Sequence, residues 1–224
     1  DKDATFARLF DLQTGRVIAT SPPHTHHLLE IGFSPDGQRG VTSGRDFSAL
    51  LWDARTGEAI GEPLKHETLQ YSPTFSRDGL HLLTVARGNL ARLWDTHTGK
   101  AVTEPLKHAL DIGAGQISRD GRQVVTLTRS PGSGSAQPLT TLYQWDLRRS
   151  RPLALDFQHP DKTPRGMHWA EFSPDGQRVL TASADGTAQV WEARTGRPVT
   201  DPMVHRSAVR LAHFSPDGRL LATA

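Results

Sequence analysis

The sequence predicts an all-β chain built from a repeated unit of 42 residues, each unit made of four short strands. Three markers recur in one register. The tetrapeptide Ser-Pro/Arg-Asp-Gly starts at five serines, in steps of 42, 42, 55 and 42 residues: Ser34, Ser76, Ser118, Ser173 and Ser215. An aromatic–acidic pair starts at Trp52, Trp94, Trp145 and Trp191, with Phe10 and Asp11 as a degenerate copy. A Thr-Gly pair follows at Thr14, Thr56, Thr98 and Thr195.

Within one unit the apolar residues alternate or are β-branched over short runs, which is typical of strands. The first strand is expected over segments such as Leu211–Pro216 (LAHFSP) and the second over Arg178–Ser183 (RVLTAS). The third is expected over Ala188–Glu192 (AQVWE) and the fourth over Pro198–Met203 (PVTDPM). Pro-Asp-Gly and Thr-Gly turns separate these strands. Helical periodicity does not extend over any useful length.

The segment Phe172–Gly196 (FSPDGQRVLTASADGTAQVWEARTG) closely resembles one unit of the WD-repeat family of β-propellers, in a form seen in bacterial repeat proteins. The resemblance covers essentially the whole chain, 1–224. It implies blades of four antiparallel strands arranged around a central channel. Each such blade has two apolar faces that only neighbouring blades can cover, which explains why the unit recurs.

Four continuous blades are expected, together with one blade divided between the two ends of the chain. The divided unit joins 1–20 with 205–224, and the continuous units are 21–64, 65–106, 107–157 and 158–204. If the ends meet, the chain forms a five-blade ring, which we favour. The alternative is an arc of a larger propeller, whose uncovered strand edges and apolar faces would invite self-association. Because the chain lacks an initiator Met, we expect a fragment of a longer protein.

A histidine precedes every Ser-x-Asp-Gly turn. It lies ten residues before the serine at His24, His66, His108 and His205, and fourteen residues before it at His159. The resemblance implies a buried hydrogen-bonded network of histidine, serine, aspartate and tryptophan, here His159, Ser183, Asp185 and Trp191. The other units depart from that pattern, since Gly44 replaces the serine and Gly88 and Leu139 replace the aspartate. We therefore predict that these histidines are structural.

No catalytic, cofactor-binding or metal-binding residue is predicted, and the chain is not expected to be an enzyme. With no cysteine, disulfides and thiolate chemistry are excluded. Nucleophile-elbow, phosphate-loop, zinc-protease and dinucleotide motifs do not occur. His26 and His27 would point to opposite faces of a strand, and no third ligand follows at metal-site spacing. The turn aspartates are expected to cap their own backbone: Asp36, Asp78, Asp120, Asp175 and Asp217.

Two insertions interrupt the repeat and form a candidate partner-binding patch. They extend loops 129–139 and 159–166, which belong to adjacent blades and open on the same face. The candidate residues are Arg129, Pro131, Gln137, Asp161, Lys162 and Arg165. A second candidate patch on the opposite face comprises Arg148, Arg149 and Arg151, which are suited to an acidic peptide or phosphate. The alternatives are neutral growth of surface loops and a solvated turn.

These observations favour a non-catalytic scaffold for protein–protein interaction, or the docking or sensing module of a larger signalling protein. The partner is expected to be a protein or peptide. No nucleic-acid partner is expected, because the net charge is only +2 and the basic residues are scattered. No membrane association is expected, and we expect a cytoplasmic location. The alternative is an enzyme or small-ligand binder at the mouth of the channel, using polar residues of the innermost strands: Glu30, Gln70, Asp111, Glu171 and Arg210.

Overall fold

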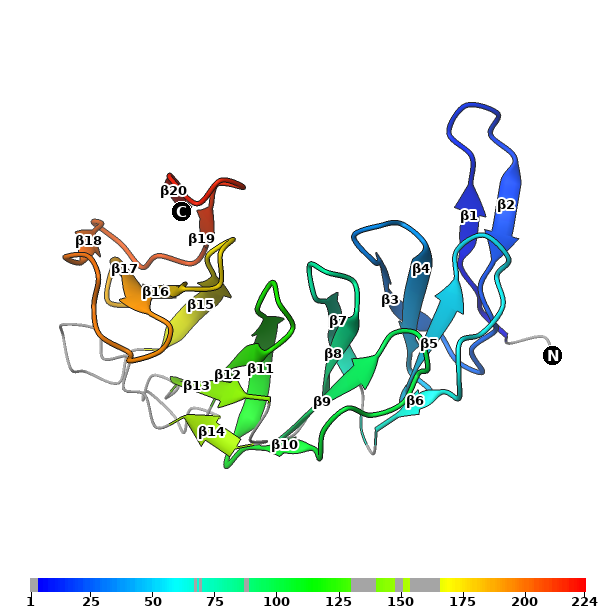
Figure 1. Ribbon diagram of the computed structural model, residues 1–224, viewed down its shortest axis with the longest axis horizontal. Helices are drawn as coiled ribbons and strands as arrows, with labels where there is room; N and C mark the ends of the chain where they lie inside the picture. The colour runs from blue at the N-terminus through cyan, green and yellow to red at the C-terminus, as the bar shows by residue number, and fades with distance from the viewer. Residues whose placement is uncertain are drawn as a thin grey trace. The chain divides into compact units, whose positions relative to one another are not determined.

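The structure is a computed structural model that describes residues 4–66, 68, 70–86, 89–129, 140–147, 151–153 and 166–224 (Figure 1). Every regular element within these ranges is a β-strand. The all-β fold class and the four-stranded antiparallel units are therefore confirmed. The chain divides into two compact units, Asp1–Lys107 and His108–Ala224.

The first unit contains one hairpin and two four-stranded antiparallel sheets. The hairpin pairs β1 (Arg8–Phe10) with β2 (Val17–Thr20). The first sheet, blade β3–β6, consists of β3 (Leu28–Phe33), β4 (Arg39–Gly44), β5 (Ser48–Asp53) and β6 (Leu64–Lys65). The second sheet, blade β7–β10, consists of β7 (Gln70–Phe75), β8 (His81–Ala86), β9 (Leu90–Asp95) and β10 (Leu106–Lys107).

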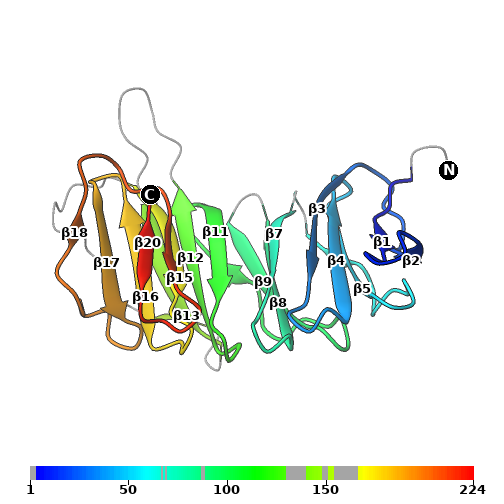
Figure 2. The same ribbon diagram turned by 90° about the horizontal axis from the view of Figure 1, so that it is seen from above.

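The second unit has two four-stranded sheets followed by a hairpin (Figure 2). Blade β11–β14 consists of β11 (Asp111–Ile117), β12 (Gln123–Arg129), β13 (Thr140–Asp146) and β14 (Arg151–Leu153). Blade β15–β18 consists of β15 (Met167–Phe172), β16 (Arg178–Ser183), β17 (Thr187–Glu192) and β18 (Met203–Val204). The hairpin pairs β19 (Ala212–Phe214) with β20 (Leu221–Thr223).

The half-blades predicted at the two ends of the chain are thus present as hairpins, and their union into one blade stays a prediction. The fourth strand is shorter than the sequence suggests. The predicted strand Pro198–Met203 is replaced by β18, which starts at Met203, and by one isolated bridge between Pro198 and Trp191. Proline has no backbone N–H to donate to a ladder, so Pro198 and Pro202 limit the pairing.

The Ser-x-Asp-Gly turn is held by its own side chains. In its first copy the Ser34 hydroxyl donates to Asp36 over 2.6 Å, and the same carboxylate accepts the Gln38 N–H over 3.0 Å. The hydrogen bond from Ser34 and that from Gln38 lower the pKa of Asp36. The serine–aspartate bond recurs at the other four copies, so the predicted capping role of these aspartates is confirmed.

The Thr-Gly turn packs one blade onto its neighbour. Asp53 accepts the backbone N–H groups of Arg55 and Thr56, which closes the turn after Trp52. Gly57 follows with a φ of 79°, and a Cβ at this position would lie 2.3 Å from the carbonyl oxygen of Thr20. Only glycine fits, because the backbone conformation is left-handed and the neighbouring strand is in contact.

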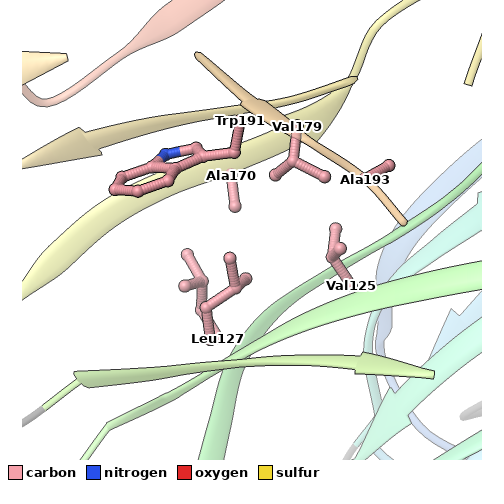
Figure 3. Packing of buried hydrophobic residues seen from close by; sticks show 7 residues of the cluster. Val125, Leu127, Ala170, Val179, Trp191 and Ala193 are labelled. Atoms are coloured by element: carbon pink, nitrogen blue, oxygen red, sulfur yellow. The ribbon is translucent and has the colours of Figure 1, made fainter. Parts of the chain in front are cut away.

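The core lies between successive blades. In the second unit, Val125 and Leu127 of β12 face Val179 of β16 and Trp191 of β17 (Figure 3). In the first unit a corresponding cluster joins blade β3–β6 to Leu82 and Trp94 of the next blade. Within each unit, apolar residues of one sheet thus pack against the adjacent sheet, as the repeat predicts.

Candidate functional site

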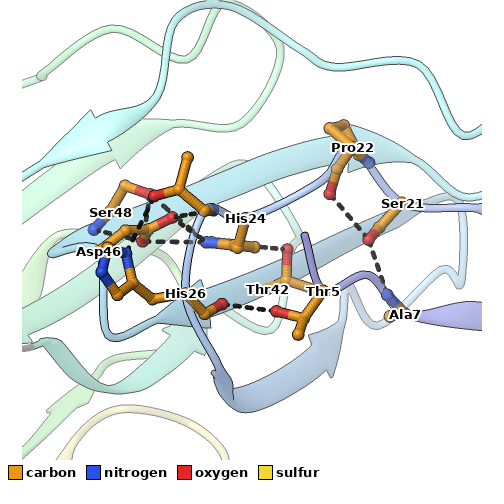
Figure 4. A network of polar contacts seen from close by, with 10 residues as sticks. Thr5, Ala7, Ser21, Pro22, His24, His26, Thr42, Asp46 and Ser48 are labelled. Atoms are coloured by element: carbon orange, nitrogen blue, oxygen red, sulfur yellow. Dashed lines mark hydrogen bonds and ion pairs between the residues drawn. The ribbon is translucent and has the colours of Figure 1, made fainter. Parts of the chain in front are cut away.

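The first group of polar side chains surrounds His24 in blade β3–β6 (Figure 4). Its Nδ1 lies 3.0 Å from both carboxylate oxygens of Asp46, and its Nε2 lies 3.0 Å from the Thr42 hydroxyl. Asp46 also accepts hydrogen bonds from the Ser48 hydroxyl over 2.8 Å and the Thr25 N–H over 3.1 Å. This arrangement ties the loop before β3 to β4 and to the β4–β5 turn.

The electrostatics of this group favour a structural role. Burial alone would raise the pKa of Asp46, but the hydrogen bonds from His24 and Ser48 outweigh it, and the pKa is lowered. Only 1% of the His24 surface is exposed, and both ring nitrogens have protein partners. A substrate would have no nitrogen of His24 to use.

The histidine bonds to a threonine in each repeat whose histidine is described. His66 lies 2.7 Å from the Thr84 hydroxyl, His108 lies 2.6 Å from Thr126 and His205 lies 3.1 Å from Thr223. With His24 and Thr42, these pairs confirm that the histidines tie a loop to the second strand of the blade. In the three pairs whose histidine is buried, those of His24, His66 and His108, the bond satisfies polar groups under the blade surface.

The tryptophan of the aromatic–acidic pair reaches the same threonine in three blades. Trp94 donates its indole N–H to Thr84 over 2.7 Å and Trp145 to Thr126 over 3.1 Å. In blade β3–β6 the Trp52 ring instead lies over Gly40, where a Cβ would come within 2.3 Å of it. The Trp52 Nε1 is buried without a hydrogen-bond partner among the described residues.

The predicted network in blade β15–β18 needs one correction. Trp191 donates to Thr181 over 2.8 Å, so Thr181 takes the place assigned to Ser183. Trp191 pairs with Val179 across the sheet, and Thr181 is the next residue on that face. Ser183 lies a further ~6.6 Å along the strand and accepts the Asp185 N–H instead. His159 lies outside the described residues, and its place in the network stays a prediction.

The sequence carried a signal for this threonine that the prediction missed. A threonine stands eight residues after every Ser-x-Asp-Gly serine, at Thr42, Thr84, Thr126, Thr181 and Thr223. Serine occupies the position of Ser183 in no other unit, since the matching residues are Gly44, Ala86 and Thr128. The threonine that all five repeats share was therefore the better candidate for the hydroxyl that accepts the tryptophan N–H.

The candidate partner-binding patches stay predictions. Arg129 ends β12 and Arg151 begins β14, and only their backbone is described. The other predicted members lie outside the described residues: Pro131, Gln137, Arg148, Arg149, Asp161, Lys162 and Arg165.

One of the polar residues expected at the mouth of the channel already has partners within the second unit. Glu171 of β15 is engaged within the fold, because one oxygen lies 3.0 Å from His213 Nδ1 and the other accepts the Phe214 N–H over 2.6 Å. Within the described ranges, no three histidine, aspartate or glutamate side chains gather as a metal site. The same part of the chain has no helix long and apolar enough to cross a membrane.

A crevice of about 670 Å³ opens between blades β11–β14 and β15–β18, on the side of the Ser-x-Asp-Gly turns. We call it the arginine crevice, and its polar lining includes Gln123, Gln177, Arg178, Glu192, Arg194 and Arg197. The first unit has a corresponding crevice of about 570 Å³ between hairpin β1–β2 and blade β3–β6. We call it the matched crevice, and its lining includes Leu9, Ile18, Gln38, Asp53 and Arg55.

Comparison with known proteins agrees with the geometry of the blades. The family model "WD domain, G-beta repeat" matches residues 15–53 and 157–192. The human protein "WD repeat-containing protein 86" is 38% identical over 52 residues, which is 23% of this chain and 14% of that protein. The chain thus spans well under two thirds of this relative's length.

With its repeated Trp-Asp and Ser-x-Asp-Gly turns and its four-stranded antiparallel blades, the chain resembles the WD-repeat β-propeller class of proteins, and two of its segments match the WD-repeat model. WD repeats generally mediate protein–protein interaction and are generally non-enzymatic. The bacterial character suggested by the sequence stays a prediction.

Proposed function

We propose that this chain is a non-catalytic interaction scaffold that binds a protein or peptide partner. The observation that carries the proposal is the role of the polar residues that recur in the repeats of this chain. Histidines, turn aspartates and strand threonines bond to one another within each blade, and the arginines are left at the surface crevice. The polar groups common to all repeats therefore build the scaffold, and the residues that differ between repeats are free to select a partner.

A docking or sensing role within a larger signalling protein is the finer form of the same proposal. The family supports it only in general terms, because WD repeats serve as interaction modules in many contexts. Loops 129–139 and 159–166 stay candidate contacts in this proposal, beside the arginine crevice.

Capture followed by reconstitution tests the proposal. The tagged chain is incubated with lysate from its source, bound proteins are identified by mass spectrometry, and each is then purified and titrated by calorimetry. We expect one partner that binds with a dissociation constant of about 1 μM or tighter, near −8 kcal/mol. Proteins that are captured but do not rebind when purified, or turnover of a small molecule by the chain, would contradict the scaffold role.

A further inference from the structure

The walls of the arginine crevice are rigid, because turns and packed strands form them. Asp175 accepts the Ser173 hydroxyl over 2.6 Å and the Gln177 N–H over 3.0 Å, which fixes the turn on one side. On another side, the segment after Trp191 is held by the Val199 N–H, which donates to the Val190 carbonyl over 2.8 Å. Beneath the crevice lies the inter-blade core of Figure 3, which includes the buried Ala193. A ligand would therefore meet a preformed surface.

Positive charge dominates the lining. Three arginines, Arg178, Arg194 and Arg197, and one carboxylate, Glu192, line the crevice. A second carboxylate, Asp175 in the adjoining turn, has its pKa lowered by the hydrogen bonds from Ser173 and Gln177 and also by the nearby Arg178 charge. Glu192 is already engaged, since it accepts the Thr195 hydroxyl, and its contact with Arg194 is long at 4.0 Å. The Arg194 side chain is 84% exposed and hence loosely held. The three guanidinium groups thus outnumber the two carboxylates near them, and guanidinium matches carboxylate geometry.

A buried glutamine orients a further donor. Gln144 of β13 is fully buried, and its side-chain amide donates to the Gln123 Oε1 over 2.9 Å and to the Ala193 carbonyl over 2.6 Å. Because the oxygen end of Gln123 is bound to Gln144, the amide N–H₂ end is the one left to serve the crevice. The lining therefore adds a neutral donor from blade β11–β14 to the arginines of blade β15–β18.

The matched crevice has the same construction and different chemistry. Gln38 and Asp53 occupy the repeat positions of Gln177 and Glu192, and Arg55 occupies that of Arg194. Leu9, the residue before Phe10, stands where Gln144 precedes Trp145.

The two crevices also differ in the charge of their linings. The matched crevice presents one arginine, Arg55, against one aspartate, Asp53. Glu58 stands at the repeat position of Arg197, which reverses the charge there. The excess of donors in the arginine crevice is thus not a general consequence of the repeat.

We propose that the arginine crevice binds an acidic peptide segment of a partner protein, with a glutamate or aspartate side chain placed between Arg178 and Arg197. This inference rests on the proposed scaffold function and names the partner chemistry. Pro198 and Val199 also line the crevice, and Val199 is 48% exposed. They offer an apolar contact for a residue next to the acidic one, so a segment that alternates acidic and apolar residues fits best.

Fluorescence polarisation with synthetic peptides tests the proposal. The probe is a fluorescein-labelled peptide of alternating glutamate and valine, and its reference is the glutamine–valine peptide of equal length. We expect the glutamate peptide to bind at low salt, at least about tenfold more tightly than the reference, and to weaken as salt rises. Equal binding of both peptides, or no binding of either, overturns the proposal.

Charge-reversal variants locate the site. Arg197→Glu and Arg194→Glu are expected to weaken the glutamate peptide by about tenfold each. Arg55→Glu in the matched crevice is the control, with the same charge change at a matching turn, and is expected to leave the affinity within about twofold. Equal losses in all three variants indicate general attraction to a basic surface and overturn the crevice assignment. Thermal midpoints measured for each variant show whether it is folded.

A label at the crevice gives an independent measurement. The chain has no cysteine, so Val199→Cys provides a unique thiol for an environment-sensitive dye. The glutamate peptide is expected to shift the emission of this dye, and a saturating peptide that leaves the emission unchanged overturns the location. If a purified partner binds the chain normally in the Arg197→Glu variant, the crevice inference fails and the scaffold function stands. If no partner binds the wild-type chain, the scaffold function itself fails.

Discussion

Blades β3–β6 and β7–β10 use the same histidine–threonine bond but treat the other ring nitrogen differently. His24 Nδ1 meets Asp46, whereas His66 Nδ1 is buried without a hydrogen-bond partner among the described residues. His66 also lies near Arg92. Burial, followed by the Arg92 charge, lowers the pKa of His66 to about 4. Both blades thus keep a threonine as partner of the histidine, whereas the carboxylate partner differs between them. We therefore expect the stability of the two blades to depend on pH in different ways.

A neighbouring position differs along with the carboxylate. A Cβ at Gly44 would lie 2.6 Å from His24 Nδ1 and 3.0 Å from an Asp46 oxygen, so this blade needs glycine there. Blade β7–β10 carries Ala86 at the same register, and Gly88 replaces the aspartate. The absence of a side chain at Gly44 and the presence of a carboxylate at Asp46 therefore go together in one blade, and both are changed in the next.

The largest expected effect comes from removing a tryptophan. Trp94→Ala deletes a buried ring and the hydrogen bond to Thr84, and should lower the free energy of unfolding by about 3–5 kcal/mol. Trp52→Ala, the matched change, also removes a buried ring and should fall in the same range. Urea denaturation followed by circular dichroism measures both. An unchanged midpoint for either variant would show that the blade assignment is wrong.

Lowering the pH should affect the stability of the two blades differently. The unfolded chain takes up a proton at His66 below pH 6.5, and the folded chain only near pH 4. The unfolded state therefore binds more protons between these values, and stability falls by about 3 kcal/mol as the pH falls through this window. His66→Asn should remove that part of the slope in urea titrations at several pH values. A slope that is the same in the variant would contradict the lowered pKa.

Asp46 responds in a lower pH range. The pKa of Asp46 in the folded chain lies below the ordinary value of an aspartate, so its contribution to stability is present above that ordinary value and is lost as the pH falls through the folded pKa. Asp46→Asn should cost about 1–3 kcal/mol at neutral pH, because His24 keeps a weaker, uncharged partner. The control is Asp53→Asn in an exposed turn, which should cost less. Equal costs for the two variants would show that the His24 contact adds nothing.

The sequence was sufficient for the fold because its signals are local and repeated. The Ser34 and Asp53 turns are specified by hydrogen bonds within a few residues, so their spacing predicts where strands end. The histidine–threonine bonds join residues 18 apart, and the shared register still revealed the histidine. The prediction erred in the position along the strand, because Thr181 and Ser183 lie on the same face and only Thr181 is close enough to accept the Trp191 N–H.

The crevices were harder to foresee. Gln144 reads as an ordinary strand residue, and its importance appears only when its amide meets Ala193, 49 residues away on the next blade. Contacts between blades depend on how two sheets pack. The repeat pattern of the sequence does not show which residues of neighbouring blades come close together. The arginines of the arginine crevice lie in no motif that the sequence analysis singled out, because they line a crevice only where two blades pack together.

The smallest expected effect tests the tryptophan nitrogens directly. Trp94→Phe keeps most of the apolar contact but loses the bond to Thr84, and should cost about 1 kcal/mol from the hydrogen bond. Trp52→Phe removes a buried N–H that has no partner in the described structure, so this variant loses no hydrogen bond. Its stability should therefore be higher than that of Trp94→Phe by about 1 kcal/mol in the same urea titration. A larger loss at Trp52 than at Trp94 would mean that the Trp52 nitrogen is bonded in solution, and the contrast between the two blades would be confined to the histidine and its carboxylate.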